Sequence, residues 1–341
     1  MMNAYPTETF QSRFFEQLER QFDKRGDMVN ATCETLHLGR DAVYRRLRGD
    51  TLLTANELMT LAQKFNIQLD EEVGNRKSST SQLIYPQGIN QVKDELEYFE
   101  QLESYCQKMI NLPEVEIDYA TPELPLYYEG FTPTLLAFKT YVYGLTSWNF
   151  EKWKGLPFSP SLIDPKMFEI TERFIPKLFK LPGRELWSIG ILDITLRQIE
   201  HAVEVGQLND RKLVDKMFEE LEDTIRHMED MARFGKKFLP GEIPSKNDPD
   251  FQVYHNEMTN TNNVIIIKSP LQSFVFSTFV NPNYIISTNE RIQVQMETWF
   301  NNLVDNSNCL SKKSSKYYRQ FFARLRRTVH AAQNRVNGLL I

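Results

Sequence analysis

The sequence predicts a mainly α-helical protein: an N-terminal helix-turn-helix bundle, a linker, a long helix, and a helical C-terminal domain with a small antiparallel sheet. Three observations support this class. Apolar residues recur at helical spacing over most of the 341 residues. A polar stretch containing Gly74 and hydroxyl residues interrupts that spacing. Strand-like text is concentrated near residues 251–287. We therefore expect a first domain at 1–72, a linker at 73–88 and a second domain at 89–341.

The first helices are expected at residues 7–23 and 28–36. Phe10, Phe14, Leu18 and Phe22 recur every four positions in the first helix. Asp27 is placed to cap the second helix, and Gly39 permits a sharp turn before the third. Helices of this length that meet at a tight turn are expected to pack as one small bundle.

The segment at residues 36–50 combines a narrow apolar stripe with a polar face. Val43 and Leu47 lie one helical turn apart and form the stripe. A helix of this kind can dock on a small core while its guanidinium groups enter a DNA major groove. The residues predicted to contact DNA are Arg40, Asp41, Tyr44, Arg45, Arg46 and Arg48. Asp41 has two open roles, as a helix cap or as an acceptor from a cytosine amino group.

The text after this segment predicts another helix. Gly49 ends the arginine-rich helix, and Thr54 with Glu57 has the spacing of a capping box. The run at residues 38–71, LGRDAVYRRLRGDTLLTANELMTLAQKFNIQLDE, resembles the helix-turn-helix domains of Cro/C1-type (XRE-like) bacterial transcriptional regulators. The resemblance covers about the first 72 residues and implies sequence-specific DNA binding. Gly39 departs from it, because such domains usually have Ser or Thr at this cap.

A long helix is expected at residues 89–110, with an apolar seam along it. Heptad spacing and the apolar residues between define the seam: Val92, Leu96, Phe99, Leu102, Cys106 and Met109. Such a seam could pair with a second copy of the chain to form a homodimer. The alternative is that the helix packs on its own C-terminal domain.

The rest of the chain is expected to be helical with one small sheet. Residues 112–130 are rich in proline and glycine and are interpreted as loop. Helices are expected near 132–145, 165–180, 184–205, 210–236, 289–302 and 315–337. Strands are expected within 251–287, at 264–268, 274–280 and 284–287. The segment 311–341 has eight Lys and Arg and no Asp or Glu. It could touch DNA phosphate or a membrane surface, although a solvated amphipathic face is the favoured interpretation.

Composition and motifs argue against several other functions. The formal charge of −5 by itself argues against a general nucleic-acid coat, and three well-separated cysteines suggest neither a zinc site nor a disulfide framework. The motifs GxSxG, GxGxxG and HExxH and the P-loop are absent, so no catalytic residues and no cofactor are predicted. A metal site at Glu200–His201 and His227–Glu229 is the weaker alternative to solvated helix faces. No signal peptide or apolar segment of membrane-spanning length is found, which predicts a cytoplasmic protein without membrane contact.

Two functional hypotheses follow from the sequence. The first is a transcriptional regulator that binds double-stranded DNA as a homodimer, with a C-terminal domain for dimerisation or for sensing an unidentified effector. The second is a protein-interaction scaffold whose helix-turn-helix is a weakly DNA-binding docking module. Site preference in a random DNA pool would separate them.

Overall fold

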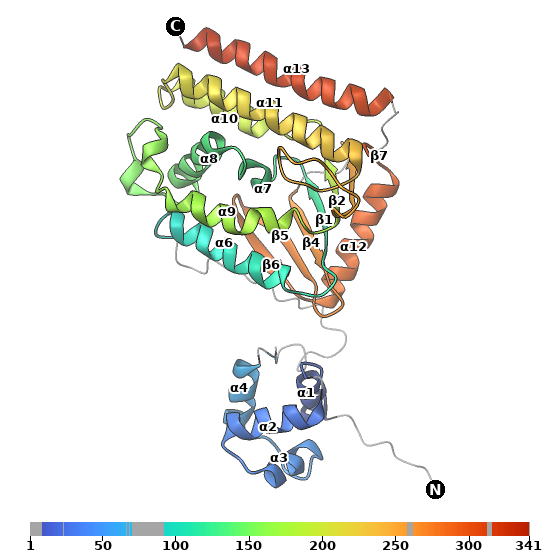
Figure 1. Ribbon diagram of the computed structural model, residues 1–341. Coiled ribbons are helices and arrows are strands. Elements are labelled where there is room, and N and C mark those ends of the chain that lie inside the picture. Colours follow the sequence, from blue (N-terminus) through green and yellow to red (C-terminus); the bar gives the residue numbers. More distant parts are fainter. Residues whose placement is uncertain are drawn as a thin grey trace. The chain divides into compact units, whose positions relative to one another are not determined.

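The computed structural model forms two compact units, Met1–Thr80 and Ser81–Ile341 (Figure 1). The residues it describes are 9–22, 24–65, 67, 69, 92–257, 262–311 and 316–340. The predicted linker at 73–88 and residues 89–91 of the predicted long helix lie outside these ranges.

The described part of the first unit is a bundle of short helices. They are α1 (Phe10–Glu19), α2 (Arg25–Leu36), α3 (Arg40–Leu47) and α4 (Ala55–Lys64). Helix α2 packs against both α3 and α4 (Figure 1). Phe14, Leu18, Val29, Val43 and Leu61 are fully buried in the shared core. An amphipathic stripe on each helix therefore supplies this core, as the periodicity predicts.

The turn between α2 and α3 differs from the prediction. His37, not Gly39, adopts the left-handed conformation, with φ of 54°. Gly39 has φ of −71° and is the N-cap of α3, without a side-chain hydrogen bond. The sequence thus identified the weak cap correctly but assigned the turn to the wrong residue. Asp27 lies in the first turn of α2, whose N-cap is Lys24, so the predicted Asp27 cap is also wrong.

The second unit contains a seven-stranded mixed sheet, which contradicts the predicted fold class. The strands are β1 (Glu116–Thr121), β2 (Gly183–Trp187), β3 (Phe251–His255), β4 (Val264–Lys268), β5 (Phe274–Val280), β6 (Asn283–Ser287) and β7 (Asn308–Cys309). Their order is β6-β5-β4-β1-β2-β3-β7. Strands β1, β2 and β3 are parallel, and the other pairs are antiparallel. The protein is therefore a mixed α/β protein rather than a mainly α one.

Strands β1 and β2 account for the error. The sequence pattern predicts a loop over 112–130 and one helix over 184–205, but strands β1 and β2 of the sheet centre lie there. Each strand places a charged residue inside the protein: Asp118 and Glu185 are both 1% exposed. Arg184 pairs with Asp118 by two hydrogen bonds of 2.8 and 2.7 Å. A partner that is distant in the sequence thus stabilises each buried charge. The periodicity of apolar residues gives no sign that such a charged position is buried.

Helices cover both faces of the sheet. Ile117, Trp187 and Val253 point to the larger core, which α6 (Glu95–Ile110) shares with other helices. These others are α7 (Leu126–Glu129), α8 (Pro133–Thr146), α9 (Lys166–Leu178), α10 (Asp193–Glu204), α11 (Arg211–Phe234) and α13 (Lys316–Leu339), with 3₁₀ turns η1 (Glu151–Trp153) and η2 (Pro160–Leu162). On the opposite face, α12 (Glu290–Asp305) packs on Ala120 and Leu186 (Figure 1). Alternate residues of one strand therefore enter different cores.

Helix α6 packs into the core of its own unit, against α9 (Figure 1). Of the predicted seam, Val92, Phe99, Cys106 and Met109 are buried in the larger core. Leu96 and Leu102 are half-buried and pack against the same core. These side chains are therefore not a free surface for a second copy. The predicted dimer seam is therefore wrong, and the alternative, in which α6 packs on its own C-terminal domain, is the arrangement found.

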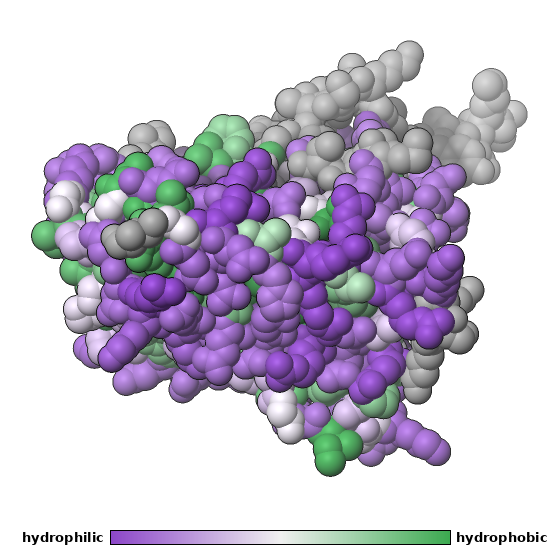
Figure 2. Space-filling model, turned by 90° about the horizontal axis from the view of Figure 1, so that it is seen from above, coloured by the Kyte–Doolittle hydropathy of each residue, from purple (hydrophilic) through white to green (hydrophobic). Residues whose placement is uncertain are grey.

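The basic helix α13 packs on acidic partners in α10 and α11. Arg335 donates two hydrogen bonds to Glu200, and Arg326 pairs with Glu229. Figure 2, which views the molecule from the side of α13 in Figure 1, shows a mainly hydrophilic surface with scattered hydrophobic residues. Within the described ranges, no helix combines the length and apolarity needed to cross a membrane.

Candidate nucleic-acid interface

Helix α3 divides sharply into a core side and an exposed side. Val43 is fully buried, and Leu47 packs against the same cluster. Asp41, Tyr44 and Arg45 are exposed. Asp41 lies in the first turn of α3, whereas Arg45 lies in its last turn. In helix-turn-helix proteins the second helix lies in the major groove, where its exposed side chains contact base edges and phosphates.

The Arg45 side chain has the fewest interactions with the rest of the described chain among the arginines of this helix. Within the part of the chain that the structure describes, its guanidinium has no ion pair or hydrogen bond. A guanidinium fork can donate two hydrogen bonds to O6 and N7 of one guanine. Tyr44, 39% exposed, stands beside it and adds an aromatic ring and a hydroxyl group. Together the Arg45 guanidinium and the Tyr44 hydroxyl present exposed hydrogen-bond donors to solvent.

Arg40 and Arg48 lie at the two ends of the helix and have weak local partners. Arg40 donates to Oδ1 of Asn30 over 3.2 and 2.6 Å, from an exposed position. Arg48 pairs with Asp50 at 2.8 Å, and both side chains are at least half exposed. Exposed pairs of this kind contribute little to stability, so a phosphate group could replace either partner at small cost.

Arg46 has a different environment from the other arginines. Its side chain is 13% exposed and pairs with Glu57 of α4 at 2.7 Å. It also donates to the Ala42 carbonyl oxygen at 3.2 Å. Glu57 in turn forms the predicted capping box with Thr54, which is confirmed. The guanidinium of Arg46 therefore joins α3 to the start of α4 instead of lying on the exposed face.

Burial and hydrogen bonding act in opposite directions on the Glu57 carboxyl group. Burial alone would raise its pKa, but the hydrogen bonds from the Thr54 backbone and from Arg46 outweigh this, so the pKa is lowered. The carboxylate is thus held in its charged form. This keeps the link between α3 and α4 intact at neutral pH.

A buried glutamine fixes the other end of α3. Gln11 of α1 is 7% exposed. Its amide nitrogen donates to the carbonyl oxygens of Arg46 and Thr51, at 2.7 and 2.9 Å. Its amide oxygen accepts from the Leu53 backbone at 2.7 Å. One side chain thus satisfies three backbone groups of the turn after α3, and it orients the helix against the bundle.

The structure therefore divides the six predicted residues by position. Arg40, Asp41, Tyr44, Arg45 and Arg48 are exposed, whereas Arg46 is enclosed by α4. The sequence reasoning missed Gln11 and the partnership of Arg46 with Glu57. The available signal for Arg46 was its place three residues after Val43, which puts it on the core side of the helix.

The chain was compared with known proteins in three ways. Comparison with protein-family models, with curated proteins and with solved structures found no match. Within the described residues, no group of three or more His, Cys, Asp and Glu side chains is placed to hold a metal ion. The exposed face of α3 is therefore the feature from which a function can be inferred.

Proposed function

We propose that the protein is a sequence-specific transcriptional regulator that binds double-stranded DNA through α3. The observation that carries this proposal is the division of α3 between a core anchored by Val43 and an exposed face containing Tyr44 and Arg45. The resemblance of residues 38–71 to Cro/C1-type domains supports it. The second unit would then serve dimerisation or effector sensing in the cytoplasm.

Tyr44 and the arginines of α3 have distinct roles in this proposal. Arg45 reads a base edge, preferably guanine, and Tyr44 contacts a base or phosphate beside it. Arg40 and Arg48 exchange their local partners for phosphate groups, which fixes the register of the helix on the duplex. Arg46 is a positioning residue, because its guanidinium is occupied by Glu57.

The test is a selection of binding sites from a random DNA pool with the full chain, followed by gel shifts at several salt concentrations. A defined site should emerge, and Arg45→Ala should weaken binding to it by about 1–3 kcal/mol and relax the preference at one position. Arg20→Ala, an exposed arginine of the same unit outside α2 and α3, is the matched control and should bind as wild type. Weak binding without site preference that vanishes at moderate salt would favour the scaffold hypothesis.

A homodimer remains part of the proposal, although the surface is not the α6 seam. Two α3 helices on one face of DNA would contact half-sites about 34–36 Å apart, one turn of the duplex. The selected sites should therefore contain a repeated half-site. A single half-site, together with a monomer in sedimentation at tens of micromolar, would overturn the dimer.

A further inference from the structure

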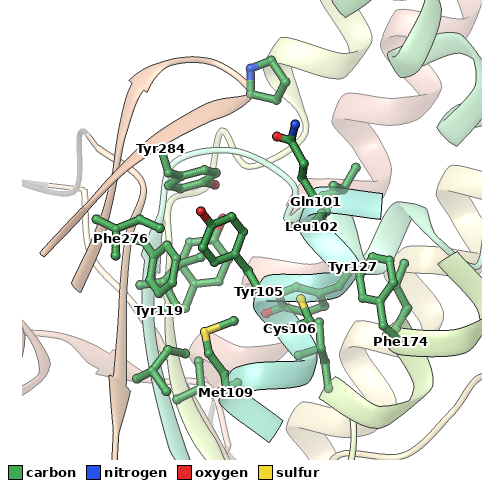
Figure 3. Close-up of a pocket in the computed structure, with 18 of the residues that line it drawn as sticks. Gln101, Leu102, Tyr105, Cys106, Met109, Tyr119, Tyr127, Phe174, Phe276 and Tyr284 are labelled. Carbon is green, nitrogen blue, oxygen red and sulfur yellow. The ribbon is translucent and has the colours of Figure 1, made fainter. Parts of the chain in front are cut away.

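A cavity of about 150 Å³ lies inside the second unit, between α6, α9 and the sheet (Figure 3). From α6, Gln101, Leu102 and Tyr105 approach it. Phe174 comes from α9, and Tyr284 comes from β6. The cavity is thus built from helices and strands that are distant in the sequence. Its size is similar to that of engineered apolar cavities that bind benzene.

The lining is mostly apolar, and much of it is aromatic. Tyr119, Tyr127 and Phe276 add their rings from the sheet and from α7, around the open space in Figure 3. Cys106 and Met109 of α6 add soft sulfur atoms. Flat rings with polar edges suit a flat aromatic ligand, because stacked and edge-on contacts both become available. Pockets for small molecules have this composition, with few polar groups.

Two polar groups in this lining, the Gln101 amide oxygen and the Tyr105 hydroxyl, have no hydrogen-bond partner among the described residues. The Oε1 atom of Gln101 is buried and forms no hydrogen bond with any described residue. The hydroxyl of Tyr105 likewise has no hydrogen bond within the described ranges. A buried polar atom left unpaired costs free energy, so a ligand that supplies the missing hydrogen bond gains affinity there.

The charge at the cavity is already neutralised. Lys237 is the one charged residue among those that line it, and its side chain is 3% exposed. Its Nζ lies 3.5 Å from Oε1 of Glu185. Burial lowers the pKa of Lys237, against the effect of Glu185, which raises it. Glu185 also accepts from Tyr127 at 2.5 Å and from Tyr128 at 3.0 Å. An anionic ligand would therefore find no free cation.

We propose that this cavity is a binding site for a neutral, mainly aromatic small molecule with one hydroxyl-type polar group, which Gln101 recognises. A hydroxyl group can donate or accept, so it suits either end of the amide. The site goes beyond DNA binding and does not depend on it. Its test contains no DNA, and failure of one proposal leaves the other standing.

The probe is 2-naphthol, which is fluorescent and neutral at pH 7. Titration of the full chain should show saturable binding of one molecule per chain and a raised midpoint of unfolding. Naphthalene should bind more weakly than 2-naphthol because it cannot pair with Gln101. Naphthalene-2-sulfonate should bind at least about tenfold more weakly, because its charge would enter a cavity without a free cation. Absence of saturable 2-naphthol binding, or tighter binding of the sulfonate, would overturn the proposal.

Variants locate the probe. Leu102→Trp should fill the cavity and weaken 2-naphthol binding at least tenfold, whereas Ser104→Trp, at an exposed position of the same helix, should not. If Leu102→Trp does not give the circular dichroism spectrum of the folded protein, the smaller change Leu102→Phe replaces it. Gln101→Leu should weaken 2-naphthol about fivefold and leave naphthalene unchanged. Unchanged 2-naphthol affinity in both a folded Leu102 variant and Gln101→Leu would place the probe elsewhere and refute the site.

Discussion

Replacing Arg46 by methionine separates a structural arginine from a DNA-contacting one. The sequence prediction includes both Arg46 and Arg45 among the DNA-contacting residues, but the structure places Arg46 against Glu57 with two hydrogen bonds of 3.3 and 2.7 Å. Methionine keeps the apolar stem of the side chain and removes the charge. We therefore expect Arg46→Met to loosen the first unit, whereas Arg45→Met should leave its stability unchanged.

The structure sets the size of the effect. Removing one partner of a fully buried pair costs about 3–5 kcal/mol, whereas an exposed pair contributes about 0–1 kcal/mol. The side chains of Arg46 and Glu57 are 13% and 19% exposed, between these limits but nearer the first. Glu57 keeps its hydrogen bond from Thr54 in the variant, which reduces the loss. We expect destabilisation by about 2–3 kcal/mol.

The effect should depend on pH. The folded pKa of Glu57 lies below its usual value of 4.5, because the hydrogen bonds from Thr54 and Arg46 outweigh burial. The stabilising contribution is therefore complete above the unfolded pKa, and it is lost as the pH falls through the folded pKa. The difference between wild type and Arg46→Met should be full at pH 7 and should shrink well below pH 4.5.

Amide hydrogen exchange of the full chain measures this effect locally. Protected amides of α3 and α4 should exchange about 30- to 140-fold faster in Arg46→Met at pH 7, the rate equivalent of 2–3 kcal/mol. Amides of α11 in the second unit are an internal control. Equal protection in Arg46→Met and wild type, or faster exchange in Arg45→Met, would refute the reasoning.

Two further predictions concern the second unit, which contains all four tryptophans and can be followed by their fluorescence. Burial lowers the pKa of His227 to about 4. The unfolded chain therefore takes up the proton first, and stability should fall by about 3 kcal/mol between pH 6.5 and 4. The His227→Phe side chain suits the rings of Phe179 and Phe238. In urea titrations this variant should show a weaker pH dependence of its free energy of unfolding than wild type. An equally strong pH dependence would contradict the role of His227. Phe99→Glu should unfold this unit, because Phe99 is 1% exposed within the intrachain core, whereas Ser104→Glu at an exposed position should not. A folded Phe99→Glu monomer derived from a wild-type dimer would restore the seam interpretation.

Local sequence determined those features whose causes are local. The capping box of Thr54 and Glu57 and the division of α3 about Val43 follow from spacing alone, because a helix places fixed intervals on fixed faces. Strands β4 and β5 were predicted within their exact bounds for a similar reason. Both have dense β-branched or aromatic text next to turn residues.

Tertiary structure alone decided which partner covers each face. The stripe on α6 predicted an apolar face, but the same stripe serves a second copy or the chain's own core equally well. Asp118 and Glu185 prevented the recognition of two central strands from the sequence, because a charged residue does not look buried. Their charges are balanced by residues that are distant in the sequence. Arg46 lies three residues after Val43, so spacing places it towards the core, but only the structure shows that Glu57 is the partner of its guanidinium. Periodicity encodes the direction of a side chain, whereas its surroundings depend on contacts that no local pattern records.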